Sequence, residues 1–184
     1  MRRVETSRAE IRVADLVLAG LMVAVGFVLH GVFPAILAGM KPDFSLIMLF
    51  VVIMVIPDTR VKLVAGLATA IITAMTTTFP GGQIANIVDK IITTGVVIGL
   101  TALLPRQIVV PGVGVLGTLV SGTVFLGTAA LVSGLPATFI SLMVAVVLPA
   151  TAINTIGLLV LYPLAAKLYS MQMAYDPSTE KARQ

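Results

Sequence analysis

The chain alternates between long runs of apolar residues and short turns rich in proline, glycine and charged side chains. A helix needs ~20 largely apolar residues to cross a ~30 Å hydrocarbon core. The runs predict six membrane spans, at residues 13–33, 44–57, 61–79, 84–104, 111–133 and 138–166. The second run is short, so we expect it to borrow residues from the preceding segment or to lie tilted behind its neighbours.

Helices are the predicted form of every span. Backbone N–H and C=O groups cannot stay unpaired in lipid, and helices joined by short polar turns satisfy them. A transmembrane barrel would instead need ~10-residue strands of alternating polarity, and the apolar runs here are unbroken. The pattern therefore predicts an all-α integral membrane protein, a bundle of six transmembrane helices.

Composition supports the same class. Hydrophobic residues make up 58% and charged residues 11% of the chain, against ~45–50% and ~25% in soluble domains. Cysteine is absent, which excludes a disulfide framework and a thiolate nucleophile. The single histidine, His30, cannot form an imidazole cluster by itself, so we expect neither a metal nor a cofactor.

Lysine and arginine are divided unevenly between the two sides of the predicted spans. Cytoplasmic segments of membrane proteins carry an excess of these residues. With the N-terminus inside, only Lys41 and Lys90 fall towards the outer side, and the other basic residues face the cytoplasm: Arg2, Arg3, Arg8, Arg12, Arg60, Lys62, Arg106, Lys167, Lys181 and Arg183.

This bias predicts two cytoplasmic termini and a simple division of the chain. A cytoplasmic segment at 1–12 precedes the membrane domain at 13–166, and a cytoplasmic tail follows at 167–184. The net charge of +4 is then explained by the orientation of the chain in a lipid membrane, and we expect no nucleic-acid partner.

Asp89 and Lys90 are the polar residues that stand out most, about one and a half turns inside the outer end of the fourth span. Ionisable residues at membrane depth are costly, so both are candidates for ligand binding. Adjacent positions on a helix point ~100° apart, and we do not expect these two to pair with each other. Gln83, Asn86 and Lys90 share one face by their i, i+3, i+7 spacing. The alternative is a buried ion-pair network that only holds helices together.

A second pair of opposite charges, Lys41 and Asp43, follows Met40 in the first outer loop. Alone, such a pair is typical of a solvated loop. All four outer-side charges fall close to the same membrane boundary, however, and two cations with two anions suit a zwitterionic ligand.

Two other groups of polar residues have plainer interpretations. Thr69, Thr73 and Thr76 follow one face of the third span, where hydroxyls usually bond to the helix's own backbone. In the last span Pro149 removes one backbone hydrogen bond. Asn154 lies about one turn further on, and we expect it to satisfy the distorted backbone or a neighbouring helix.

Small residues indicate close helix contacts in two spans. Gly20 and Ala24 form a small-xxx-small pair in the first span, and Gly114, Thr118 and Gly122 do the same in the fifth. We interpret the fifth-span set as packing within the bundle. No G-x-x-x-x-G-K-[ST], H-E-x-x-H or G-x-S-x-G motif occurs, so the sequence predicts no enzyme and no P-loop ATPase.

Three stretches of the sequence resemble the tryptophan transport protein family. They are residues 29–34, the segment Gly39-Met40-Lys41-Pro42-Asp43, and the segment from Thr76 to Lys90, which reads TTTFPGGQIANIVDK. That family is similar to the substrate-binding (S) components of energy-coupling factor (ECF) transporters. The resemblance implies a six-helix S-component fold in the prokaryotic cell membrane, which captures substrate from outside.

The resemblance also implies partners and roles. A separate ECF module, with a membrane coupling protein and ATPase subunits, would power release, and Gly20 and Ala24 match the small residues that contact the coupling protein. The tryptophan carboxylate suits Lys90 or Lys41 and its ammonium suits Asp89 or Asp43, with Gln83 and Asn86 on the same polar face. Met40, Phe44 or Phe79 would line the ring.

Other readings of the sequence remain open. The chain could be a gradient-driven or solitary small amino-acid permease, an oligomeric channel, or an S component for another small aromatic metabolite. The first two predict uptake without ATPase partners.

Overall fold

The computed structural model describes residues 11–32 and 43–174, and these residues form helices and turns without a β-strand. Four helices stand separately: α1 (Val13–Val32), α2 (Phe44–Val55), α3 (Thr59–Thr76) and α4 (Gly82–Leu103). The remaining segments join into two continuous rods. One is α5 (Val109–Gly112), η1 (Val113–Gly117) and α6 (Thr118–Val132), and the other is α7 (Phe139–Leu142), η2 (Met143–Val147) and α8 (Leu148–Ala174).

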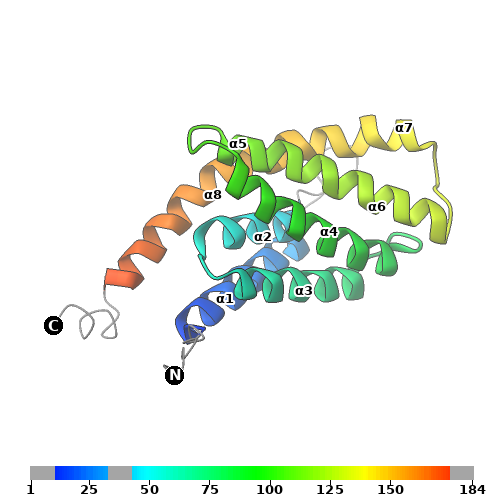
Figure 1. The fold of residues 1–184 in the computed structure, drawn as a ribbon. Helices are drawn as coiled ribbons and strands as arrows, with labels where there is room; N and C mark the ends of the chain where they lie inside the picture. The colour runs from blue at the N-terminus through cyan, green and yellow to red at the C-terminus, as the bar shows by residue number, and fades with distance from the viewer. Residues whose placement is uncertain (1–10, 33–42, 175–184) are drawn as a thin grey trace, which may run out of the picture.

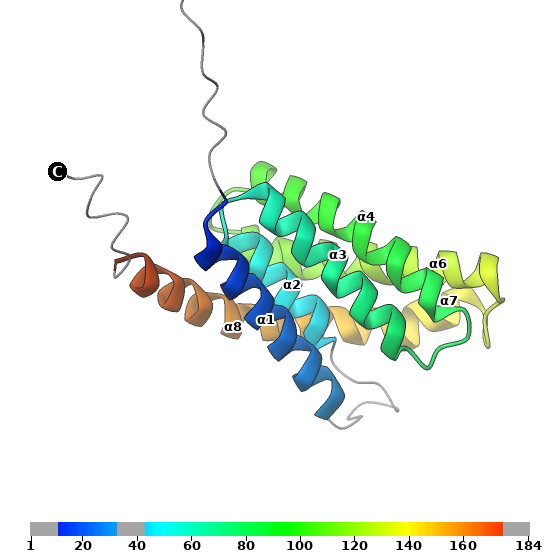
Figure 2. The same ribbon diagram turned by 90° about the horizontal axis from the view of Figure 1, so that it is seen from below.

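The short helix α2 lies at the centre of the bundle (Figures 1 and 2). It packs against α1, α3, α4, α8 and η1. Every residue from Ser45 to Ile53 is buried, so the helix presents no face to the surroundings. A helix that is apolar on all sides is stable only when other helices cover it. The described part of the second predicted span therefore lies behind its neighbours.

The other helices carry apolar side chains on their outer surfaces. Exposed leucine, isoleucine, valine and methionine residues run along α1, α3, α4, α6 and α8. Five helices, with the two joined rods counted once each, are long and apolar enough to cross a membrane. Water does not tolerate so much exposed apolar surface, whereas lipid does. The structure is thus that of a multi-pass membrane protein.

The helix boundaries differ from the predicted spans mainly at the end of the last one. The predicted sixth span stops at residue 166, whereas α8 continues to Ala174. The rod from Phe139 to Ala174 has 36 residues, or about 54 Å at 1.5 Å per residue. That length exceeds a ~30 Å hydrocarbon core, so this rod extends beyond the apolar layer.

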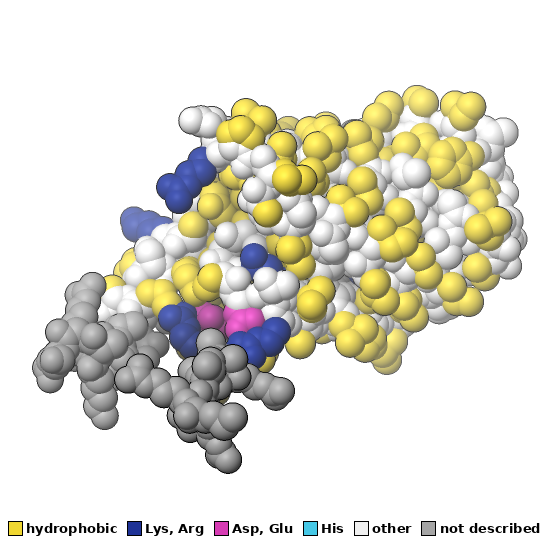
Figure 3. Space-filling model, in the orientation of Figure 1, with side chains coloured by type: hydrophobic (Ala, Val, Ile, Leu, Met, Phe, Trp, Pro, Cys, Tyr) yellow, Lys and Arg dark blue, Asp and Glu magenta, His cyan; other side chains and the backbone are white. Residues whose placement is uncertain are grey.

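The two ends of the bundle differ in charge. Figure 3 shows Lys and Arg side chains gathered at one end of the visible face, while patches of hydrophobic side chains are spread over the rest. We call this the basic end, and it carries Arg12, Arg60, Arg106 and Lys167. We call the opposite end, where α3 ends and α4 begins, the distal end (Figure 2).

Local sequence explains how several helices begin. The Asp58 carboxylate caps α3 by accepting from the backbone N–H of Arg60 at 2.8 Å. The Arg60 side chain, through its hydrogen bond, lowers the pKa of Asp58 to about 2, so this carboxylate stays ionised at physiological pH. At the distal end Gly81 caps α4 with a φ of +68°, in the left-handed region that favours glycine.

Two π-helical turns adapt the rods to their neighbours. The turn at η2 comes just before Pro149, where the proline ring is incompatible with a regular helical hydrogen bond. Close contacts bring η1 against α8 and α6 against η2. A Cβ added at Gly114 would lie 2.8 Å from Thr155 Oγ1, and one at Gly122 would lie 2.5 Å from Val147 Cγ1. This confirms the packing role predicted for Gly114 and Gly122 of the fifth span.

Candidate functional site

A cavity of about 290 Å³ lies within the distal half of the bundle. Its size approaches the lower bound of ~300 Å³ typical of small-molecule sites. The polar side chains that line it come from α1, α3, α4, α6 and α8, with Asp43 just before α2: His30, Asp43, Thr73, Thr76, Thr77, Asn86, Asp89, Lys90, Thr118, Ser121 and Asn154. Its apolar wall is formed by Leu46, Phe79, Phe125, Leu126, Leu142, Val146, Val147 and Ala150.

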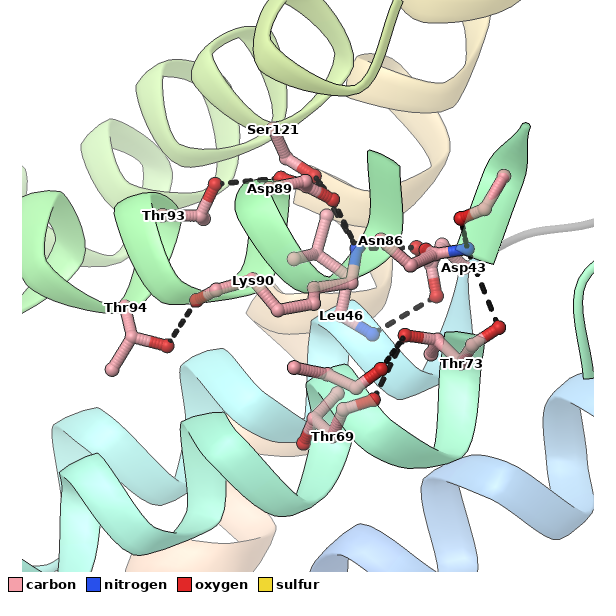
Figure 4. A network of polar contacts seen from close by, with 12 residues as sticks. Asp43, Leu46, Thr69, Thr73, Asn86, Asp89, Lys90, Thr93, Thr94 and Ser121 are labelled. Atoms are coloured by element: carbon pink, nitrogen blue, oxygen red, sulfur yellow. Dashed lines mark hydrogen bonds and ion pairs between the residues drawn. The ribbon is translucent and has the colours of Figure 1, made fainter. Parts of the chain in front are cut away.

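Lys90 is the hub of the polar wall (Figure 4). Its ammonium donates to Asp89 Oδ2 at 2.7 Å, to Asp43 Oδ2 at 3.4 Å and to Ser121 Oγ at 3.4 Å. These partners come from α4, from the start of α2 and from α6, so one side chain joins three elements. Lys90 is only 2% exposed.

The prediction that Asp89 and Lys90 do not pair with each other is wrong. Their Cα–Cβ bonds do diverge on the helix, but a lysine side chain has four flexible methylene groups. Its ammonium can therefore fold back onto the preceding residue. Asp43 and Ser121 hold it there by approaching from the neighbouring elements.

The Asp89 carboxylate is fully satisfied within the network. Its Oδ2 accepts from Lys90 and from Ser121 Oγ at 2.9 Å, and its Oδ1 accepts from Thr93 Oγ1 at 2.8 Å. A buried charge survives only when it is paired and hydrogen-bonded in this way. Asp89 and Lys90 are thus fixed in place before any ligand arrives.

Asp43 connects the network to the more open part of the site. Its Oδ1 caps α2 by accepting from Leu46 N–H at 3.0 Å and lies 3.9 Å from His30 Nδ1. Burial favours the neutral form, but the charge of Lys90, with His30 and the Leu46 N–H, outweighs it and lowers the pKa of Asp43. Two carboxylates therefore share the single ammonium of Lys90.

Of the residues predicted to share a polar face of α4, some line the cavity and one does not. Asn86 lines the cavity, and its amide donates to the backbone oxygens of Gly82 at 2.9 Å and Thr73 at 3.3 Å. It therefore joins α4 to α3. Gln83 is exposed in the first turn of α4 and does not line the cavity, so its predicted contact with a ligand stays untested.

The threonines of α3 behave as predicted. Thr69, Thr73 and Thr76 each donate to a backbone oxygen of their own helix at 2.8 Å. Thr73 and Thr76 still line the cavity, whereas Thr69 does not.

Phe79 and Phe125 form the aromatic part of the apolar wall. Their ring centroids lie 5.3 Å apart with an interplanar angle of 71°, an edge-to-face arrangement. Phe79 was predicted from the sequence, and Phe125 comes from α6. Phe44 does not line the cavity. The predicted residues Met40 and Lys41 lie outside the described part of the chain.

The cavity residues that were not predicted as site residues include Ser121, Phe125, Thr118 and Asn154. Ser121 and Phe125 carried no signal in the sequence, because a lone serine or phenylalanine in an apolar run is common. Thr118 and Asn154 were assigned to helix contacts, but neither side chain has a hydrogen-bond partner among the described residues. The predicted bond from Asn154 to the backbone or a neighbouring helix is therefore wrong.

Gly20 and Ala24 lie far from this cavity on the outer face of α1. Both are exposed and line an apolar groove between α1 and α3, with Ala65, Ala68 and Ile72 on the opposite wall. A Cβ added at Gly20 would meet no atom within 4 Å. These small residues therefore do not serve close packing among the described helices.

A charged cavity among helices long and apolar enough to cross a membrane defines the class: a multi-pass membrane protein with room for one small ligand. A family model described as "Tryptophan transporter TrpP" matches residues 12–170. The chain belongs to this tryptophan transporter family.

Three curated relatives cover most of the chain, and each is named "Probable tryptophan transport protein". The one from Bacillus subtilis is 44% identical over 153 residues, which are 82% of this chain and 89% of the relative. Those from Clostridium acetobutylicum and Clostridium perfringens are 46% and 41% identical, over 77% and 80% of this chain and 85% and 88% of their own lengths. No solved structure matches the chain.

The pairing of Lys90 with Asp89 predicts strong coupling between their substitutions. Lys90→Met alone should lower the free energy of unfolding by ~3–5 kcal/mol, because it leaves Asp89 buried without its cation. Combining it with Asp89→Asn should cost less than the sum of the two single changes, since no uncompensated charge then remains. Unfolding in detergent micelles, followed by circular dichroism, measures all three losses.

Lys62→Met provides the matched control, because Lys62 is a half-buried lysine at the basic end of α3. It should change stability little. Additive losses for Lys90→Met and Asp89→Asn would contradict an energetic coupling between the two side chains.

Proposed function

We propose that the protein binds tryptophan in the distal cavity and serves its uptake across the cell membrane. The observation that carries this proposal is the shared lysine: two carboxylates and one ammonium face a cavity whose other wall is apolar and aromatic. An amino acid with a large ring matches both walls. Membership of the tryptophan transporter family and the names of the relatives support the same ligand.

The charges of the described cluster favour a ligand that brings a cation. Asp43 and Asp89 together carry two negative charges against the one positive charge of Lys90. The ammonium of an amino acid would pair with Asp43 or Asp89. Its carboxylate would take up the Lys90 ammonium, whose contact with Asp43 is long, and Lys41 stays a second candidate for that end.

The ring would lie against the apolar wall. Leu46 and Val147 offer an aliphatic surface for the ring, and Phe79 and Phe125, which lie nearer the distal end, would cover the amino acid from that side. Burial of a flat aromatic side chain between such surfaces is favourable because it removes apolar area from water. Met40 remains part of the proposed ring site.

The charge distribution supports an orientation for the bundle. Arg12, Arg60, Arg106 and Lys167 mark the basic end, and an excess of such residues is typical of the cytoplasmic side. The cavity then faces outside, where it can capture substrate. Six helices would cross the cell membrane, with both termini in the cytoplasm.

Release into the cell requires a source of energy. The sequence has no P-loop, so we propose that the chain acts as the S component of an ECF transporter and that a coupling protein and ATPase subunits drive release. The groove at Gly20 and Ala24 supports this role, because it is apolar and exposed, and a Cβ added at Gly20 would meet no atom within 4 Å.

Ligand analogues test the assignment of the two charges. Tryptamine, which lacks the carboxylate, should bind the purified protein at least ~30-fold more weakly than tryptophan, the usual loss when one partner of a buried pair is removed. Lys90→Met should weaken tryptophan strongly and tryptamine little, because both changes remove the same contact. The chain contains no tryptophan, so the fluorescence of the ligand itself reports binding.

Equal penalties for tryptophan and tryptamine in Lys90→Met would contradict the carboxylate assignment. The affinities of the wild-type protein for the other amino acids provide the control, because they show whether binding depends on the aromatic ring. Binding of small aliphatic amino acids as tightly as tryptophan would contradict the proposed function.

Thiol labelling tests the orientation, and the absence of native cysteine leaves no background. In intact cells Arg106→Cys should resist an impermeant thiol reagent, whereas Thr78→Cys, exposed in the turn between α3 and α4, should react. Permeabilised cells provide the control, in which both sites should label. Labelling of Arg106→Cys from outside would rule out this orientation.

A double substitution in the groove tests the coupling partner. Gly20→Leu with Ala24→Leu should abolish uptake and preserve tryptophan binding, because the new side chains fill the groove rather than the interior. Gly95→Leu is the matched control: this glycine of α4 also has open space around it and lies outside the groove. Uptake that survives the double substitution would instead favour a solitary or gradient-driven permease.

A further inference from the structure

The cavity contains two kinds of polar groups that differ in how they are satisfied. The charged groups, Asp89 and Lys90, have all their hydrogen bonds within the protein. Thr118 and Asn154 are equally buried, at 3% and 0% exposure, yet Thr118 Oγ1 and both polar atoms of Asn154 have no partner among the described residues. Both side chains line the cavity.

Buried polar groups without a partner are rare in folded proteins, and each one calls for an explanation. An amide surrounded by apolar residues is disfavoured unless something bonds to it. Here the two unpartnered side chains come from different rods and meet at the same cavity. A ligand that fills the cavity would be in contact with both.

Helix geometry gives the depth of Thr118 and Asn154, measured along the rods away from the distal end. Thr118 precedes Ser121 by three residues on one helical face, which places it about 4.5 Å deeper along the rod than the charged network. The proximity of Gly114 to Thr155 and of Gly122 to Val147 shows that the rod of η2 and α8 runs antiparallel to the rod of η1 and α6. Asn154, beside Thr155, therefore lies deeper than Thr118.

The polar groups follow the same order along the cavity as along tryptophan, with the charges first and the neutral group further in. The charged end of the amino acid would bind at Asp89 and Lys90, and the ring would extend inward towards Thr118 and Asn154. The indole nitrogen carries one N–H, a donor without an acceptor. Asn154 Oδ1 and Thr118 Oγ1 are both acceptors, and the amide can rotate to present its oxygen.

We propose that Asn154, assisted by Thr118, accepts a hydrogen bond from the indole N–H and thereby selects tryptophan over phenylalanine and other rings that lack this donor. The inference rests on the proposed function, since it presumes that tryptophan occupies the cavity. An apolar pocket alone discriminates weakly between rings of similar shape. A buried acceptor left unpaired by the wrong ligand discriminates strongly.

The test compares tryptophan with benzothienylalanine, in which sulfur replaces the indole N–H and the shape is nearly kept. The wild-type protein should prefer tryptophan by about 5- to 150-fold, the range expected for one buried hydrogen bond. Asn154→Leu, of similar size, should remove most of this preference, and Thr118→Val should reduce it. Equilibrium dialysis with the purified full-length protein measures each affinity.

Thr151→Val is the matched control. Thr151 of α8 is buried, as Thr118 of α6 is. Its hydroxyl donates to the backbone oxygen of Val147, however, and it does not line the cavity. This variant should keep the wild-type preference. If Asn154→Leu does not fold, the ratio of the two affinities in Thr118→Val and in the wild type still decides the result.

The outcomes separate this inference from the function on which it rests. Equal binding of the two ligands by the wild type, or an unchanged preference in Asn154→Leu and Thr118→Val, would overturn the role of the acceptors and leave the tryptophan site in place. Failure of the wild type to bind either ligand would overturn the proposed function, and the inference with it.

Discussion

The buried ammonium of Lys90 is the constraint on which the distal half of the bundle depends. A charge that is 2% exposed within an apolar bundle is stable only beside fixed counter-charges. Asp89 supplies one from the same helix, Asp43 supplies another from the start of α2, and Ser121 approaches from α6. Satisfying one side chain therefore fixes the relative positions of three elements around the cavity.

The central helix α2 makes this arrangement possible. Its apolar residues are covered on all sides, so its position is determined by contact with α1, α3, α4 and α8 rather than by lipid. Asp43 caps its first turn, and the same carboxylate contacts Lys90. The cap and the ion pair thus reinforce each other. A shift of α2 along its axis would carry the capped Asp43 with it and break the contact with Lys90.

The cavity combines a rigid charged wall with a deeper neutral region that lacks partners. With such a division, the charged wall would orient the ammonium and carboxylate of a zwitterion, and the neutral region would contact its side chain. The charged groups need no rearrangement before binding, because their hydrogen bonds already hold them. The unpartnered amide and hydroxyl are the groups whose environment a ligand would change most. Specificity would then come from neutral polar atoms, and general affinity for amino acids from the charges.

The sequence by itself determined the helical class, the boundaries of most helices and the separation of basic residues from the distal end. Hydropathy and charge bias are properties of consecutive residues, so they can be read without knowing how helices pack. It also indicated Asn86, Asp89 and Lys90, because ionisable and amide groups are rare in apolar runs, and Asp43, because the outer-side charges fall at the same membrane boundary.

Only the tertiary structure decided which polar groups meet. The pairing of Lys90 with Asp89, the contribution of Ser121 and the exposure of Gln83 depend on the rotation and depth of each helix and on the path of a flexible lysine. Asn154 illustrates the same limit, since its sequence context favoured a helix contact and the packing left it facing a cavity. Periodicity places a residue on a face of its helix, but the neighbours that cover that face come from distant parts of the chain.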